Sequence, residues 1–104
     1  MKSKQPGKGT SGIAALNGEP RGMNVTITDD YLTVELRDGR VISTPLIWYP
    51  RLQEASPADR AVWEWIGSGI GIAWPLLDED LGISGMLRGI PSIDYRRQPA
   101  HAPA

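Results

Sequence analysis

Residues 25 to 46 alternate between apolar and polar side chains, and this alternation limits the fold more than any other feature of the sequence. In an extended segment, alternate side chains point to opposite faces, so Val25 and Ile27 would share one face. The next extended segment repeats the pattern with three apolar residues on one side: Leu32, Val34 and Leu36. Both segments are therefore predicted to be strands with one buried face.

Turn residues separate these strands. Asp29-Asp30 are typical of turns, and Asp38-Gly39 is a strong hairpin signal because glycine tolerates the positive φ of tight turns. A third strand is expected over residues 41 to 45, with Ile42 and Leu46 pointing inward. The prediction is a three-stranded antiparallel meander.

Helix signals follow the meander. Pro50 can begin a short turn, and Ser56-Pro57 is a stronger start, with serine as N-cap and proline at the first helical position. We predict a helix from there to about residue 66. Its buried stripe would consist of five apolar residues at helical spacing: Ala58, Ala61, Val62, Trp65 and Ile66.

Residues 70 to 74 alternate again and predict a fourth strand, which Pro75 would end. Ser84 can cap a short helix that stops at Gly89. The expected fold class is therefore α+β: a small antiparallel sheet, made of a three-stranded meander plus a fourth strand, packs against one main helix and a short C-terminal helix.

The two ends of the chain differ from this middle part. Residues 1 to 22 hold all three lysines and are expected to form a flexible basic tail, and residues 92 to 104 a flexible C-terminal tail. The domain is expected over residues 23 to 91. A core of about 68 residues is marginally stable alone, so a partner protein or a homo-oligomer is expected to add stability.

Charge and composition exclude several classes of function. Residues 24 to 91 carry ten acidic residues against five arginines, which disfavours nucleic-acid binding by the domain and favours a protein partner with a basic face. A nucleic-acid-associated regulator that uses the basic N-terminal tail is the alternative. The chain has no cysteine, no apolar run of about 20 residues and no signal-peptide pattern, so we expect a cytoplasmic protein with no membrane contact.

The acidic run Asp78, Glu79 and Asp80 is the main candidate for chemistry. If it is extended, Asp78 and Asp80 point to one side and Glu79 to the other, which leaves few oxygens to hold a metal. His101, the one histidine, lies in the expected tail. We therefore expect no cofactor, no metal and no catalysis, and a metal-dependent enzyme working through this run ranks third among the functions considered.

Large aromatic residues are the other candidates for a site. Trp65 and Trp74 fall on apolar faces and are assigned to the core, whereas Trp63 lies at the border of the predicted helix stripe. Trp48 and Tyr49 stand in a connection between elements. Exposed aromatic side chains are typical of partner interfaces, but in a small domain they can also widen the core, and both readings stay open.

Five blocks of the sequence together resemble the domain of unknown function family 2442 (DUF 2442). The blocks are DGR (38–40), PLIWYPRL (45–52), ASPADR (55–60), GIGIAWPLLDEDL (69–81) and GMLRG (85–89). The resemblance covers about residues 23 to 89. It implies a small bacterial or phage α+β domain without an established activity, often one half of a gene pair with a DUF 4160 protein in the manner of a toxin and its antitoxin.

This resemblance favours a noncatalytic protein-interaction domain, antitoxin-like or regulatory, with a DUF 4160-type protein as a candidate partner. Many family members have a histidine where this chain has Ala73, so a histidine-dependent site is not expected here. The two most specific blocks also suggest that Arg51 pairs with the acidic run. Such a pair would hold the connection to the last strand. In the alternative reading, the acidic run is a docking surface for a partner.

Overall fold

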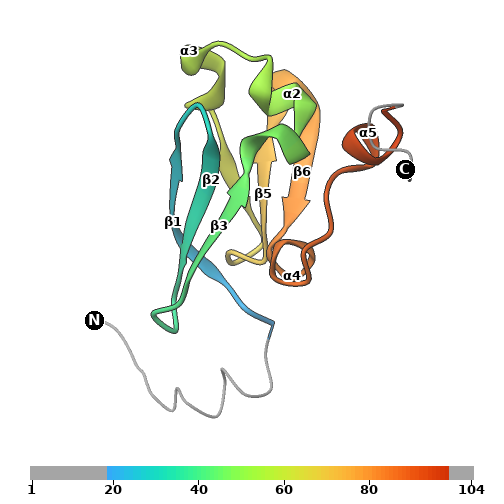
Figure 1. Ribbon diagram of the computed structural model, residues 1–104. Helices are drawn as coiled ribbons and strands as arrows, with labels where there is room; N and C mark the ends of the chain where they lie inside the picture. The colour runs from blue at the N-terminus through green and yellow to red at the C-terminus, as the bar shows by residue number, and fades with distance from the viewer. Residues whose placement is uncertain (1–18, 99–104) are drawn as a thin grey trace.

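The computed structural model describes residues 19 to 98 (Figure 1). Two three-stranded antiparallel sheets and several short helices make up this part of the chain, which has the expected α+β class. The expected tails over residues 1–18 and 99–104 lie outside the described residues. In the part of the chain that is described, no helix is long and apolar enough to span a membrane.

The first sheet confirms the predicted meander. It contains β1 (Gly22–Ile27), β2 (Tyr31–Leu36) and β3 (Val41–Pro45), in the order β1-β2-β3 and all antiparallel. The hairpin between β2 and β3 turns at Gly39, whose φ of 96° explains the glycine. Alternation works as expected, because the apolar side chains of β2 are buried at Leu32, Val34 and Leu36.

The predicted fourth strand exists, but it belongs to a second sheet and does not extend the meander. This sheet contains β4 (Glu64–Ile66), β5 (Gly71–Trp74) and β6 (Glu79–Gly82), in the order β4-β5-β6. β5 pairs with a neighbour on each side, so its edges are used within the second sheet. The prediction of a single sheet with four strands was therefore wrong.

The prediction of one main helix up to about residue 66 is also wrong. Its start is correct, because Ser56 Oγ accepts the backbone N–H of Asp59 at 3.1 Å, but the helix α3 (Pro57–Arg60) lasts one turn. Residues 64 to 66 then form β4 and pair with β5. Trp63 and Trp65 are two residues apart, and their rings meet edge to face with centroids 5.0 Å apart, an arrangement that an extended backbone allows.

Short helical turns fill the connections. They are η1 (Leu46–Trp48), α2 (Pro50–Gln53), η2 (Pro75–Leu77), α4 (Ile83–Leu87) and α5 (Ile93–Arg96). The turn at Pro50 and a short helix before Gly89 agree with the sequence, but the expected cap was wrong, because Ser84 lies inside α4 and Gly82 is its N-cap. Residues 92 to 98 were expected to be a flexible tail, yet Ser92 caps α5 by accepting the N–H of Tyr95 at 3.2 Å.

The core lies between the two sheets. Side chains from both sheets and from the short helices form one buried cluster: Leu32, Val34, Leu36, Leu46, Tyr49, Leu52, Ile72, Trp74, Leu81, Ile83 and Met86. The sheets approach closely at Gly22, where an added Cβ would lie 2.5 Å from the ring of Trp65. The fold leaves β1 at one side of the molecule and β6 with α5 at the other (Figure 1).

Candidate functional site

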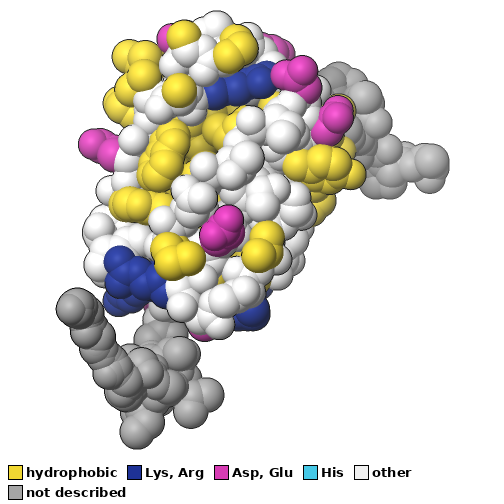
Figure 2. All heavy atoms as spheres, turned by 90° about the vertical axis from the view of Figure 1, so that its left-hand side faces the viewer, with side chains coloured by type: hydrophobic (Ala, Val, Ile, Leu, Met, Phe, Trp, Pro, Cys, Tyr) yellow, Lys and Arg dark blue, Asp and Glu magenta, His cyan; other side chains and the backbone are white. Residues whose placement is uncertain are grey.

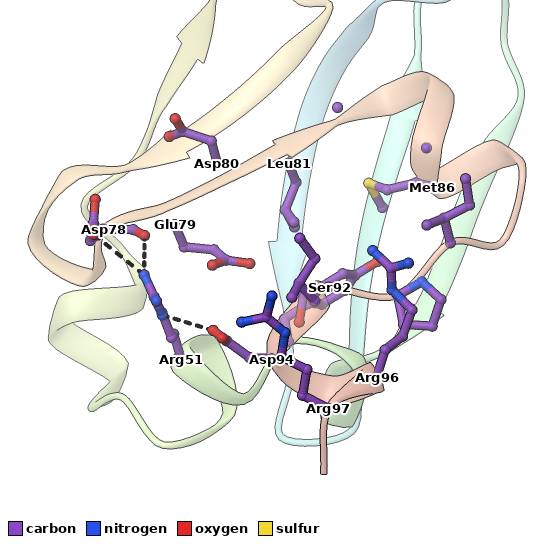
Figure 3. A pocket seen from close by; sticks show the side chains of 16 residues that line it. Arg51, Asp78, Glu79, Asp80, Leu81, Met86, Ser92, Asp94, Arg96 and Arg97 are labelled. Carbon is purple, nitrogen blue, oxygen red and sulfur yellow. Dashed lines mark hydrogen bonds and ion pairs between the residues drawn. The ribbon is translucent and has the colours of Figure 1, made fainter. Parts of the chain in front are cut away.

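An open groove of about 600 Å³ lies between β6 and the C-terminal segment. Its lining contains the whole acidic run and two of the other candidate residues, Tyr49 and Arg51. α4 and residues 90 to 97 form the opposite wall. The groove therefore brings together residues from the middle and the end of the chain (Figure 3).

Glu79 is the buried member of the acidic run. Strand alternation in β6 turns Glu79 inward, and the residue is 8% exposed, whereas Asp78 and Asp80 are exposed. Figure 3 shows the Glu79 carboxyl pointing into the groove and Asp80 pointing away from it. Among residues 19 to 98, the carboxyl of Glu79 has no hydrogen-bond or ion-pair partner.

Burial raises the pKa of the Glu79 carboxyl above its usual value. The nearby guanidinium of Arg51 acts in the opposite direction, and the acidic groups of Asp94, Asp80 and Asp78 raise the pKa further. A buried carboxylate without a partner is unfavourable because it has lost water and gained no compensating bond. The groove thus holds an acid whose ionised form is poorly satisfied by the described part of the chain.

Arg51 links three elements at the edge of the groove. It starts from α2, and its Nη1 donates to the backbone oxygen of Asp78 at 2.5 Å and lies 3.4 Å from the Asp78 carboxylate. Its Nε lies 2.9 Å from the carboxylate of Asp94 in α5. The predicted pairing of Arg51 with the acidic run is present, although the shortest contact is to a main-chain oxygen and a second acid, Asp94, also pairs with Arg51.

The local backbone explains how Asp78 reaches Arg51. Asp78 has φ 51° and ψ 45°, a left-handed conformation that aspartate tolerates better than most residues. This residue ends η2 and reverses the chain into β6. The turn directs the Asp78 carbonyl to Arg51 and leaves the next residue, Glu79, facing inward.

The C-terminal wall contributes residues that the sequence analysis assigned to a tail. Asp94, Arg96 and Arg97 line the groove, and neither Arg96 nor Arg97 forms an ion pair with any described residue. Ser92 fixes this wall, because its hydroxyl and its N–H both donate to the backbone oxygen of Trp48, at 2.8 and 3.2 Å. The capping serine of α5 was the sequence signal that could have located this wall.

The aromatic candidates do not form one surface. Tyr49 is 1% exposed, and its hydroxyl donates to Thr44 Oγ1 at 3.0 Å, so it packs in the core with little exposed surface. Burial raises the pKa of Tyr49. Trp48 is half-buried in η1, and Trp63 is half-buried and lines a second groove, beside β1.

The acidic run is not arranged as a metal centre. Over the described residues, no three histidine, cysteine, aspartate or glutamate side chains come together in a group that could hold a metal ion. Asp78 and Asp80 are turned away from Glu79 by the turn and the strand that carry them. The groove instead combines one buried acid with several arginines.

Comparison with known proteins gives a family but no activity. A crystal structure of a protein of unknown function from Rhodospirillum rubrum, at 2.75 Å resolution, is similar to this chain, with a TM-score of 0.63 and 27% sequence identity. The match covers 82% of this chain and 100% of the other. No curated protein matches the chain. The family profile described as "Protein of unknown function (DUF2442)" matches residues 23–92, and the chain therefore belongs to the DUF2442 family.

Proposed function

We propose that this protein is a noncatalytic interaction domain that binds a basic segment of a partner protein in the groove beside β6. The observation that carries the proposal is the carboxyl of Glu79, which is buried, faces the groove and lacks a partner among the described residues. An arginine or lysine side chain of the partner would supply the missing charge and hydrogen bonds.

The surroundings of Glu79 support a cationic guest. Four acidic side chains and three arginines line the groove, and two of the acids, Asp78 and Asp94, already hold Arg51. Glu79 remains for a partner inside the groove, and the exposed Asp80 beside it adds negative charge at the surface. The acidic balance of residues 24 to 91 would also steer a basic partner toward the domain.

The kind of partner follows from the family resemblance. We propose a small bacterial protein, with a DUF 4160-type protein as the first candidate, and an antitoxin-like or regulatory role for this chain. Such a pairing suits a small domain whose own core supplies limited stability. The described residues carry no histidine that could activate a serine nucleophile, which gives catalysis little support.

The test compares two substitutions that each remove one negative charge from the same strand. Glu79→Gln and Asp80→Asn are made in the full chain, and binding of a DUF 4160-type protein and of a short arginine-containing peptide is measured by calorimetry and NMR. We expect Glu79→Gln to weaken binding by about tenfold or more, and Asp80→Asn by a few-fold with strong salt dependence.

The pH dependence of binding provides an independent check. A cation prefers the ionised carboxylate, so affinity should fall as the pH decreases through the raised pKa of Glu79, and Glu79→Gln should not show this fall. Equal affinities of the two variants would contradict the proposal. Hydrolytic turnover that vanishes in Glu79→Gln would make the carboxyl a catalytic group instead.

A further inference from the structure

The two sheets have four edge strands, and one of them lacks the features that normally prevent edge pairing. β3 ends in Pro45, β4 has three residues with a glutamate, and β6 has four residues with two acids. Proline, charge and short length all discourage the addition of another strand. β1 is different because it has six residues and contains neither a charged residue nor a proline.

The outer edge of β1 offers free main-chain groups. The hydrogen bond from the Thr28 N–H to the Tyr31 oxygen, at 2.9 Å, sets which residues bond to β2. Along an antiparallel pair, every second residue forms main-chain hydrogen bonds to the neighbouring strand. The N–H and C=O groups of Thr26 therefore face β2, and those of Val25 and Ile27 face outward. None of these outward groups has a hydrogen-bond partner among residues 19 to 98.

A groove of about 640 Å³ runs along this edge. Residues 25 to 29 form one side, and Pro57, Arg60, Ala61 and Trp63 form the other. Figure 2 looks onto this side of the molecule, where hydrophobic side chains gather in the upper half around a basic side chain, with acidic side chains at the margin. The edge is therefore open to an added strand, with half-buried Val25, Ile27 and Trp63 available for contact.

The charges at the ends of β1 favour a second copy of this chain as that strand. Arg21 precedes β1, and Asp29 and Asp30 follow it, whereas the strand between them is uncharged. If two copies pair β1 to β1 antiparallel about a two-fold axis, the positive end of each strand lies toward the negative end of the other. If the axis passes near Thr26, Val25 of each copy lies opposite Ile27 of the other. Each of these two residue pairs would form two main-chain hydrogen bonds, four in total.

We propose that two copies of this protein associate through their β1 edges, which joins the two meanders into one antiparallel sheet across the dimer. The axis near Thr26 places the two Thr26 side chains opposite each other on the exposed face, where threonine pairs are favourable. The proposal is independent of the Glu79 groove, which lies on the other side of the fold (Figure 1).

The test measures the mass of the full chain by sedimentation over a range of concentrations. We expect a dimer, twice the 11.3 kDa of one chain, and a tenfold or larger weakening in Thr26→Lys because two lysines would meet at the axis. Val41→Lys is the matched control, since Val41 is 62% exposed on β3, the other edge of the same sheet. This control should dimerise like the original chain.

A charge-rescue experiment separates the interface from effects on folding. Thr26→Lys and Thr26→Glu should each be monomeric and folded by circular dichroism, and a mixture of the two should form a heterodimer. A full chain that stays monomeric up to sub-millimolar concentration would overturn the proposal, even if it bound another extended peptide. Equal dimer affinities for Thr26→Lys and Val41→Lys would also overturn it.

Discussion

Two arginines hold neighbouring parts of this fold in opposite ways. The side chain of Arg60 is 12% exposed and donates to the main-chain oxygens of Leu52 and Gln53, both at 2.8 Å, while also pairing with Asp29. The side chain of Arg51 is 44% exposed and bridges Asp78 and Asp94 at the rim of a groove. Arg60 thus ties segments of the fold together, and Arg51 lies at a surface where Glu79 has no partner among residues 19 to 98.

The two surroundings differ in how completely their polar groups are satisfied. Around Arg60, main-chain oxygens of α2 and the indole N–H of Trp74, which donates to the Arg60 oxygen at 3.0 Å, complete a closed network. Around Arg51, the buried Glu79 has no partner among the described residues. A buried polar group without a hydrogen bond lowers the stability of the protein on its own. A partner that supplied this hydrogen bond would gain the most binding energy there.

The largest effect is expected from Arg60→Ala. It would leave the oxygens of Leu52 and Gln53 without their charged donor, and we expect a loss of about 2–4 kcal/mol in the free energy of unfolding. Thermal melts should show a decrease of roughly 10 °C or more. Arg60→Lys should recover only part of this, because lysine cannot reach several acceptors in one plane. A melting temperature within a degree or two of the original would remove the distinction between the two arginines.

Glu79→Gln should change stability in the other direction. The folded pKa of Glu79 lies above its unfolded value, so the two proteins should be equally stable at low pH, where the acid is protonated in both states. As the pH rises through the folded pKa, the original chain should become less stable than the variant, by about 1 kcal/mol. Denaturant titrations at several pH values measure this difference, with Asp80→Asn as the exposed control. A variant less stable than the original chain at neutral pH would show that the carboxylate is satisfied.

Arg51→Ala should have a smaller effect on stability. Because Arg51 and its partners are exposed to solvent, the loss should be under about 1 kcal/mol and should shrink in high salt. The same variant should raise the pKa of Glu79 further, since Arg51 is the group that lowers it. Carbon-13 NMR of the Glu79 carboxyl follows this pKa directly. A large loss of stability with no change in that pKa would show that Arg51, like Arg60, mainly stabilises the fold.

Arg40→Ala sets the lower limit of the comparison. Arg40 pairs with Asp38 at 2.8 Å in the β2–β3 turn, and both side chains lie near the surface. We expect a change of a few tenths of a kcal/mol at most, measured by the same melts. An effect as large as that of Arg51→Ala would mean that exposure does not separate these ion pairs.

Local patterns in the sequence predicted much of this fold. The alternation in β1 and β2, the turn at Gly39, the turn at Pro50 and the N-cap at Ser56 depend on neighbouring residues, and all four were confirmed. The end of α3 does not depend on neighbours alone. Residues 61 to 66 fit a helical stripe, but pairing of β4 with β5 outweighs the weak preference for continuing a short helix.

The candidate site was predictable in part. The acidic run, its alternation and the involvement of Arg51 could be read from adjacent residues. The opposite wall could not, because Asp94 reaches Arg51 only after the chain has passed through β6 and α4. That Glu79 lacks a partner within the described part of the chain is a three-dimensional property, and no pattern in the sequence expresses it.

The contacts at Gly22 limit how far this domain can be truncated. The Gly22 N–H donates to the Gly69 oxygen at 2.7 Å, and the Arg37 N–H donates to the Arg21 oxygen at 2.9 Å. The family match begins at residue 23, beyond both bonds, and ends at residue 92, before Asp94. Contacts of the fold therefore extend past both ends of the family match, and a fragment trimmed to residues 23–92 would lose them.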